Sequence, residues 1–163
     1  MSNSTDIKSN KIEGVELPTK VHDLICFALY SANSAMNRSY KPHLKALGLT
    51  YPQYIALVAL WECDGVSVGQ LCEKLMLETS TLTPVLQRLE KLGHIVRKRS
   101  EADERKVFLH LTKSGKALQE KSTAITGCII DSTSLPLPVL DELVATLTTL
   151  RDSMTKELQA ERG

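Results

Sequence analysis

The sequence predicts a mainly α-helical fold with one small β-hairpin. Apolar residues recur at helical spacing in six segments, which are separated by capping residues, glycines or prolines. Two short segments rich in strand-forming residues, 94–99 and 106–111, flank a charged tip and predict the hairpin. Because the hairpin directly follows two short helices joined by a tight turn, the expected architecture is a winged helix-turn-helix.

Length and composition favour one soluble domain. The 163 residues are 42% hydrophobic and 24% charged, as in globular proteins, and the longest apolar run is far shorter than a membrane span. Residues 1–16 are polar and expected to be disordered, which leaves 17–163 as the domain. The N-terminus has no apolar segment, so we expect no signal peptide, a cytoplasmic location and reduced cysteines.

The first helix is expected to be long. It should run from about Thr19 to Leu47, and Gly48 marks its end. Pro42 lies inside this segment and should kink or split the helix near Lys41, because proline removes one backbone hydrogen bond.

The next three helices lead up to the hairpin. The second opens at residues 50–52 and stops at 64–65, and its apolar run 54–61 predicts burial on most sides. Ser67 caps a third helix, 68–75, and the turn 76–78 leads into a fourth that ends at Gly93. Spacing alone fits an ordinary helical hairpin in a bundle equally well. The β-hairpin that follows favours the winged alternative.

Charge points to the same region. Residues 78–113 carry 8 basic and 5 acidic side chains, whereas the rest of the chain is balanced or acidic. A mixed-charge segment can simply be a solvated surface, but it also suits a surface that faces DNA phosphates. In a winged helix the fourth helix approaches the major groove, and the basic hairpin reaches the backbone or the minor groove. The candidate DNA contacts are Thr79, Ser80, Thr81, Thr83, Gln87, Arg88, Arg97, Arg99, Asp103, Arg105 and Lys106.

The remaining helices suggest self-association. A fifth helix starts after Thr112 and reaches about 130, and a sixth covers about 139–158. Together with the first helix they carry more apolar surface than a small winged helix can cover. We therefore expect a homodimer, with a DNA-binding lobe at about 50–112 and dimerisation helices at about 19–47 and 113–158. Two-fold symmetry would place the recognition helices about 34 Å apart on a palindrome.

The four cysteines, at positions 26, 63, 72 and 128, form no CxxC pair, so we expect no metal and no cofactor. Cys26 lies about 120° from the middle of the apolar stripe of its helix, with polar neighbours on the same flank. By itself a lone thiol is more often inert than reactive. A thiol beside polar groups can nevertheless have its thiolate stabilised.

Several motifs resemble one family. Asp103-Glu104-Arg105 followed by Leu111-Thr112 is similar to the wing signature of the MarR family of regulators. The runs 24–30 (LICFALY), 48–54 (GLTYPQY) and 82–84 (LTP) resemble the OhrR branch, the organic-hydroperoxide-sensing repressors. The resemblance covers about residues 19–120. It implies a dimeric winged helix-turn-helix that represses a peroxide-resistance gene.

The resemblance also implies roles for single residues. Cys26 matches the peroxidatic cysteine, and Tyr40 and Tyr51 match two tyrosines that hydrogen-bond its sulfur. Arg105 matches the wing arginine that enters the minor groove of DNA. Cys128 lies where the two-cysteine members carry a resolving thiol. Phe27 would line a pocket that favours organic hydroperoxides over hydrogen peroxide. One departure is the turn before the fourth helix, which reads Glu78-Thr79-Ser80 where the family usually has Asp-Ser-Gly.

Helix geometry restricts the sensor. Tyr40 follows Cys26 by 14 residues, so about 21 Å separates them along one helix. Because a tyrosine side chain cannot span that distance, a contact between the two requires the other subunit.

The expected function is therefore that of a DNA-binding repressor, not an enzyme. Oxidation of Cys26 and a disulfide with Cys128 of the partner subunit would release the operator. One alternative is a regulator that binds a small phenolic ligand in the same interface cleft. A more distant one is a thiol peroxidase, against which we set the lack of a helix N-terminus and of a nearby arginine at Cys26.

Overall fold

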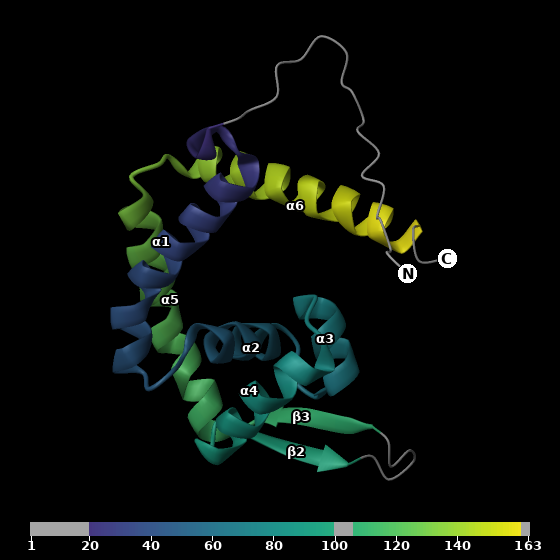
Figure 1. The fold of residues 1–163 in the computed structure, drawn as a ribbon. Helices are drawn as coiled ribbons and strands as arrows, with labels where there is room; N and C mark the ends of the chain where they lie inside the picture. Colours follow the sequence, from purple (N-terminus) through teal and green to yellow (C-terminus); the bar gives the residue numbers. More distant parts are fainter. Residues whose placement is uncertain (1–19, 100–105, 161–163) are drawn as a thin grey trace. The chain divides into compact units, whose positions relative to one another are not determined.

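A computed structural model describes residues 20–99 and 106–160 of the chain, apart from the side chains of 158 and 159 (Figure 1). The chain divides into two compact units between Ala35 and Met36. The boundary falls inside helix α1, and each unit is described by itself. The expected disorder of residues 1–16 lies outside the described residues.

The first unit shows that the long helix begins later than the sequence predicts. Val21–Asp23 form a short 3₁₀ helix, η1, and Leu24 is extended before α1 starts as Ile25–Ala46. The carbonyl of Leu24 accepts the first helical hydrogen bond, from the Ala28 N–H at 3.0 Å. The predicted single helix from about Thr19 is therefore wrong, because the backbone at Leu24 interrupts it.

Pro42 does not split the helix. α1 continues unbroken from Ile25 to Ala46 with the proline inside it. Leu44, only 2% exposed, anchors the segment after the proline in the core and so offsets the missing hydrogen bond. The helix ends where predicted, because Gly48 adopts φ +70° and the Leu49 N–H bonds back to the Leu44 carbonyl at 3.0 Å.

The next three helices agree with the predicted bounds. They are α2 (Tyr51–Glu62), α3 (Val68–Leu75) and α4 (Thr79–Lys91). The starts of α2 and α3 have a local reason at their caps. The Thr50 N–H donates to the side chain of Gln53 at 2.8 Å, and the Ser67 hydroxyl accepts from the Gln70 N–H at 3.2 Å. α3 and α4 form the helix-turn-helix, and Met76 supplies its turn with a left-handed backbone, φ 54°.

The wing is a three-stranded antiparallel sheet in the order β1-β3-β2. β2 (Ile95–Arg99) pairs with β3 (Val107–Leu111) so that Arg97 lies opposite Leu109. β1 (Val66–Ser67) adds to the other edge of β3 and was not predicted. Two residues are too few to show a strand periodicity.

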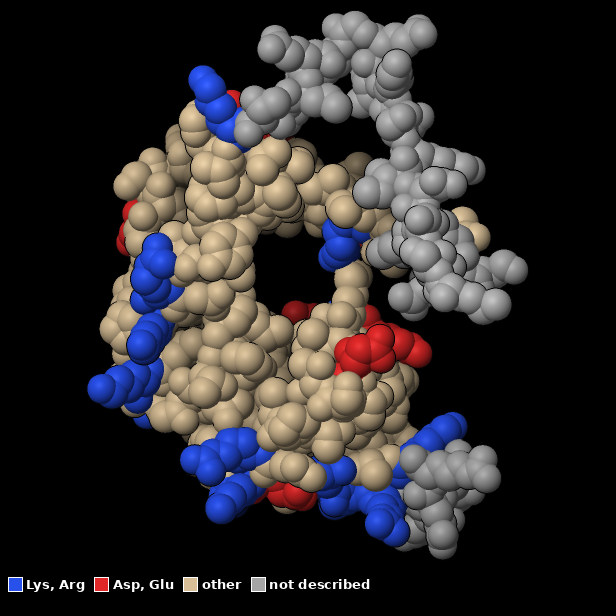
Figure 2. Space-filling view, viewed as in Figure 1, with Lys and Arg blue, Asp and Glu red and all other residues tan. Residues whose placement is uncertain are grey.

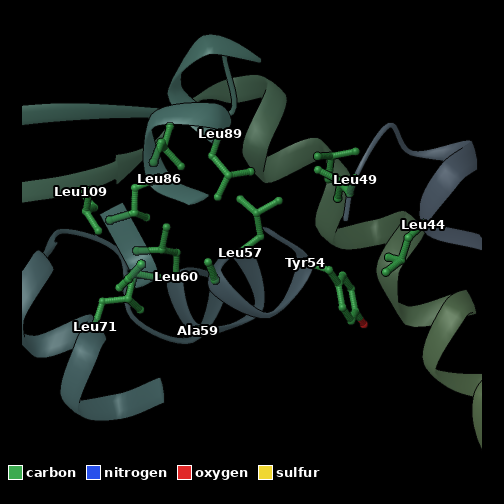
Figure 3. Packing of buried hydrophobic residues seen from close by; sticks show 14 of the residues in the cluster. Leu44, Leu49, Tyr54, Leu57, Ala59, Leu60, Leu71, Leu86, Leu89 and Leu109 are labelled. Atoms are coloured by element: carbon green, nitrogen blue, oxygen red, sulfur yellow. The ribbon is translucent and has the colours of Figure 1, made fainter. Parts of the chain in front are cut away.

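The core lies between α2, α3, α4 and the sheet (Figure 3). Its fully buried side chains are mostly leucines, and each contributes about 1.5–3 kcal/mol of burial free energy. They include Leu57, Leu60, Leu71, Leu82, Leu86, Leu89, Ile95 and Leu109. Leu92 is 38% exposed because α4 ends one residue before it.

The last two helices differ in burial. α5 (Lys113–Thr133) buries Leu118, Ile125 and Ile129, whereas α6 (Leu137–Ala160) has no buried residue among its described side chains. In the described part of the chain no single helix is long and apolar enough to cross a membrane, although α5 and α6, bent by 96°, pass that test as a pair.

Candidate functional site

The outer face of α4 is polar. Ser80, Thr81, Gln87 and Arg88 are exposed on it, while the leucines of the same helix face the core. The spacing that buries one side of an amphipathic helix presents the other side to solvent. These four predicted DNA contacts are thus available to a ligand.

Four other candidates surround one hollow. A cavity of about 420 Å³ is lined by residues 67–69 at the start of α3, by Thr79 and Thr83, and by Arg97, Lys106 and Val107 of the wing. The Thr83 hydroxyl donates to the Thr79 carbonyl at 2.7 Å, and the Thr79 hydroxyl lies 3.7 Å from the sulfur of Cys72. Arg97 approaches Glu90 at 4.0 Å, and its buried Nε has no partner among the described residues.

Figure 2 shows several basic side chains at the end of the second unit that carries the wing. Arg99 is exposed at the end of β2, and Lys106 is exposed just before β3. Asp103 and Arg105, the predicted wing-tip residues, lie outside the described residues. In the segment 78–80, which departs from the family pattern, α4 begins at Thr79 and Glu78 is its N-cap.

The two tyrosines that were predicted to hydrogen-bond Cys26, Tyr40 and Tyr51, lie side by side. The rings of Tyr40, on α1, and Tyr51, at the start of α2, are 5.1 Å apart, and Tyr40 is 5.7 Å from Tyr54. Burial raises the pKa of Tyr40 and of Tyr51 above the ordinary 10.0, and the nearby Tyr54 raises both further. Both phenols are therefore protonated at neutral pH and can donate hydrogen bonds.

A largely apolar cavity of about 450 Å³ opens beside this pair. Its lining includes Tyr51, Leu44, Leu49, Lys41 and Lys45. Positive charge near a thiol favours the thiolate. The cavity thus combines an apolar wall with groups that would stabilise an anion.

Cys26 is the second residue of α1, and its side chain is exposed. This corrects the expectation that the thiol lies away from a helix N-terminus. The free N–H groups and the dipole of a first helical turn favour a thiolate. One of the two arguments against a peroxidase is therefore lost. Phe27 follows in the same turn and is 38% exposed.

The other cysteines occupy different settings. Cys128, the predicted resolving thiol, is exposed on α5. Cys63 is exposed at the end of α2, and Cys72 is buried in α3. No disulfide joins any of the four in this structure.

Tyr54 and Trp61 extend the group of aromatic rings around Tyr40 and Tyr51, but the sequence predicted them only as core residues. Tyr54 contacts Tyr40, and Trp61 packs edge-on against Tyr54 at 6.3 Å. The signal was present in the sequence, because positions 51, 54 and 61 repeat at helical spacing and so share one side of α2.

Comparisons with known proteins show to which family the chain belongs. Residues 38–122 match the model of the transcriptional regulator family SarA/Rot. The organic hydroperoxide resistance transcriptional regulator of Bacillus subtilis is 42% identical over 83% of this chain and 92% of its own length. The regulator TtmR of Methylorubrum extorquens is 38% identical over 92% of this chain and 75% of its own.

Solved structures of AbfR, from Staphylococcus epidermidis, are also similar. Reduced AbfR bound to DNA is 31% identical, covers 85% of this chain and 94% of its own, and gives a TM-score of 0.71. The disulfide form gives 0.58 at 31% identity, over 85% of this chain and 92% of its own. These matches, together with the helix-turn-helix and its wing, establish that the chain belongs to the MarR family of transcriptional regulators, in the OhrR branch.

Proposed function

We propose that this regulator binds palindromic operator DNA as a homodimer and releases it when organic hydroperoxides oxidise Cys26. The exposed polar face of α4 and the cationic cavity beside it support the DNA-binding part. A relative with a similar fold, AbfR, is known as a complex with DNA. Asp103 and Arg105 complete the proposed interface at the wing tip.

The observation that carries the sensing role is the pairing of Tyr40 with Tyr51 at 5.1 Å. Two protonated phenols held together form a ready site for an anionic sulfur. In the dimer they would meet Cys26 of the partner subunit, and Lys41 and Lys45 would add positive charge. The exposed position of Cys26 in the first turn of α1 supports its reactivity.

The chemistry proceeds in two steps. The Cys26 thiolate attacks the terminal oxygen of the hydroperoxide, the O–O bond breaks, and the sulfur becomes a sulfenic acid. The leaving alkoxide takes one proton from the solvent and departs as an alcohol. The Cys128 thiol of the partner subunit then attacks the sulfenic sulfur, a disulfide forms, and water leaves. Phe27 provides apolar contact for the alkyl part of the hydroperoxide. Reduction by a cellular thiol restores the sensor.

DNA release follows from the loss of the anion. The disulfide removes the acceptor that holds the tyrosines, and the movement changes the spacing of the recognition helices. Couplings of this kind typically change affinity by about 5- to 150-fold. The existence of AbfR in reduced and disulfide forms supports such a cycle.

The test is a gel shift combined with a non-reducing gel. The DNA probe is selected from a random-sequence library with the reduced protein, and cumene hydroperoxide is then added. We expect loss of binding together with an intersubunit disulfide, both reversed by dithiothreitol. Cys26→Ser should keep DNA bound, and Cys63→Ser, at another exposed thiol, should respond like the wild type. Binding that survives full oxidation of Cys26 would contradict the sensing role.

A second candidate is a regulator that binds a small phenolic ligand. The apolar cavity beside Tyr51 favours it, because its volume of about 450 Å³ suits a small aromatic molecule. This alternative predicts that Cys26→Ser still releases DNA when the inducer is added. Sustained consumption of hydroperoxide with a dithiol reductant would instead indicate a thiol peroxidase.

A further inference from the structure

The last turn of α2 is attached to the start of α5, and the bend that follows α2 is attached to the end of the wing. The indole N–H of Trp61 donates to the Gly115 carbonyl at 2.9 Å. Three residues later, the Asp64 carboxylate accepts from the Leu111 N–H at 2.8 Å and pairs with Lys116 at 3.5 Å. The end of α2 and the bend after it thus hold the point where β3 passes into α5.

The start of α5 in turn holds the turn that follows α4. The Thr112 hydroxyl donates to the Gly93 carbonyl at 2.6 Å, and the Thr112 N–H donates to the His94 carbonyl at 3.0 Å. Gly115 lies so close that a Cβ there would be 2.1 Å from the His94 carbonyl oxygen. Such a tight contact leaves no room for α5 to shift without moving the end of α4.

On its other side, Trp61 leads back to the sensor tyrosines. Its ring packs against Tyr54 at 6.3 Å, and Tyr54 packs against Tyr40 at 5.7 Å. All these residues lie within the unit that begins at Met36. Contacts therefore run without a break from the tyrosine pair to the end of α4 and the wing.

We propose that Trp61 is a positioning residue that couples the tyrosine pair to the recognition helix through its hydrogen bond to Gly115. The inference rests on the proposed redox function and adds a route to it. When the thiolate is lost and Tyr40 moves, the Tyr54 ring moves with it and shifts the edge of the indole. The N–H···O bond passes that shift to the start of α5. Coupling between distant sites requires such an element, one that both sites can bias.

The sharpest variant replaces Trp61 by β-(3-benzothienyl)alanine, which keeps both rings and lacks the N–H donor. Trp61→Phe is a second variant that needs no unnatural residue. The measurement is the dissociation constant for the selected DNA in the reduced and disulfide states, together with the rate of Cys26 oxidation. We expect the reduced protein to bind within about 2-fold of the wild type, and the oxidation rate to be unchanged. The dissociation constant of the disulfide state divided by that of the reduced state should fall by about 2- to 10-fold relative to the wild type. A change of this size is the effect of one hydrogen bond.

Tyr54→Phe is the matched control. It also removes one polar hydrogen from the same side of α2, since the Tyr54 hydroxyl lies 3.5 Å from Thr126, and it keeps an aromatic ring. Its ratio should equal that of the wild type, and an equal fall would overturn the role of the indole N–H. Equal weakening of both redox states in the Trp61 variants would reveal a merely structural bond and overturn the inference alone. Failure of the wild type to release DNA would overturn the proposed function as well.

Discussion

Asp64 links three elements through one carboxylate. It accepts from the backbone N–H groups of Leu111 and Gly65 at 2.8 and 2.9 Å, and Lys116 lies 3.5 Å away. Burial raises the pKa of this carboxyl, but the two backbone hydrogen bonds and Lys116 outweigh burial, so the pKa lies below the ordinary 3.8. A depressed pKa means that the ionised carboxylate stabilises the fold above about pH 4.

Asp64→Asn should therefore destabilise the protein in a pH-dependent way. At neutral pH the free energy of unfolding should fall by about 1 kcal/mol, a value reduced by the exposure of the site. The stabilisation is lost as pH falls through the lowered pKa of the folded state, so the two proteins should become equal only below that pKa. Urea denaturation across this range measures the difference. A difference in stability that stays constant as pH falls from neutral through the acid range would contradict the role of the charge.

Gly115 lies where a side chain does not fit. In Gly115→Ala the new Cβ would meet the His94 backbone, which must move, and we expect a loss of about 2–4 kcal/mol of stability. Gly127→Ala is the control in the same helix, because its Cβ meets nothing within 4 Å. There, alanine should be neutral or stabilise by about 0.5–1 kcal/mol. Thermal unfolding of both variants compares the two sites, and equal stabilities would contradict the close packing.

Among the elements, α3 depends on its cap. The Ser67 hydroxyl accepts from the Gln70 N–H, and the Ser67 N–H donates to the Gln70 side chain at 2.8 Å. Ser67→Ala should cost about 0.5–2 kcal/mol, whereas Ser67→Asp, another good cap, should recover most of it. Chemical denaturation followed by circular dichroism is the measurement. If both variants lose the same stability, the cap hydrogen bond is not the cause.

The sequence predicts an element well where its ends carry their own signals. α2, α3 and α4 have the predicted bounds because Thr50, Ser67 and Gly93 act locally. α1 was misplaced because the extended backbone at Leu24 leaves no trace in the apolar spacing. β1 exists only because β3 pairs with it, and a partner far along the chain cannot be read from two residues.

In the candidate site, too, some features could be predicted from the sequence and others could not. Tyr40 and Tyr51 were predicted through the family motif, and the structure places their rings together. The later start of α1 changed the setting of Cys26, which no motif could indicate. The contact from Trp61 to Gly115 joins positions 54 residues apart, and such tertiary contacts override any local pattern.

On the scale of the whole molecule, α6 presents an apolar face that is only partly buried within its own unit. Leu143 and Val144 are 45% and 64% exposed, and Leu147 and Met154 lie on the same face. Surfaces of this kind usually bind a partner, and in the proposed dimer the second copy covers this one.

Leu143→Glu combined with Val144→Glu should therefore produce a monomer that binds palindromic DNA much more weakly. Buried charges at an interface cost several kcal/mol, more than a typical subunit contact can offset. Light scattering after size-exclusion chromatography gives the mass. Thr149→Glu, on the opposite side of the helix, is the control and should leave the dimer intact. A double variant that remains dimeric would place the interface elsewhere.

Trp61 is the single tryptophan of the chain, which gives the molecule an optical property of its own. All tryptophan fluorescence of the protein comes from Trp61, at the contact between α2 and α5. The ring of Tyr54, at 6.3 Å, is close enough to transfer its excitation energy to the indole. Emission excited at wavelengths that only tryptophan absorbs therefore reports this one contact without any attached dye. Stopped-flow fluorescence could follow it in real time while hydroperoxide is added, in the unmodified protein and in the presence of DNA.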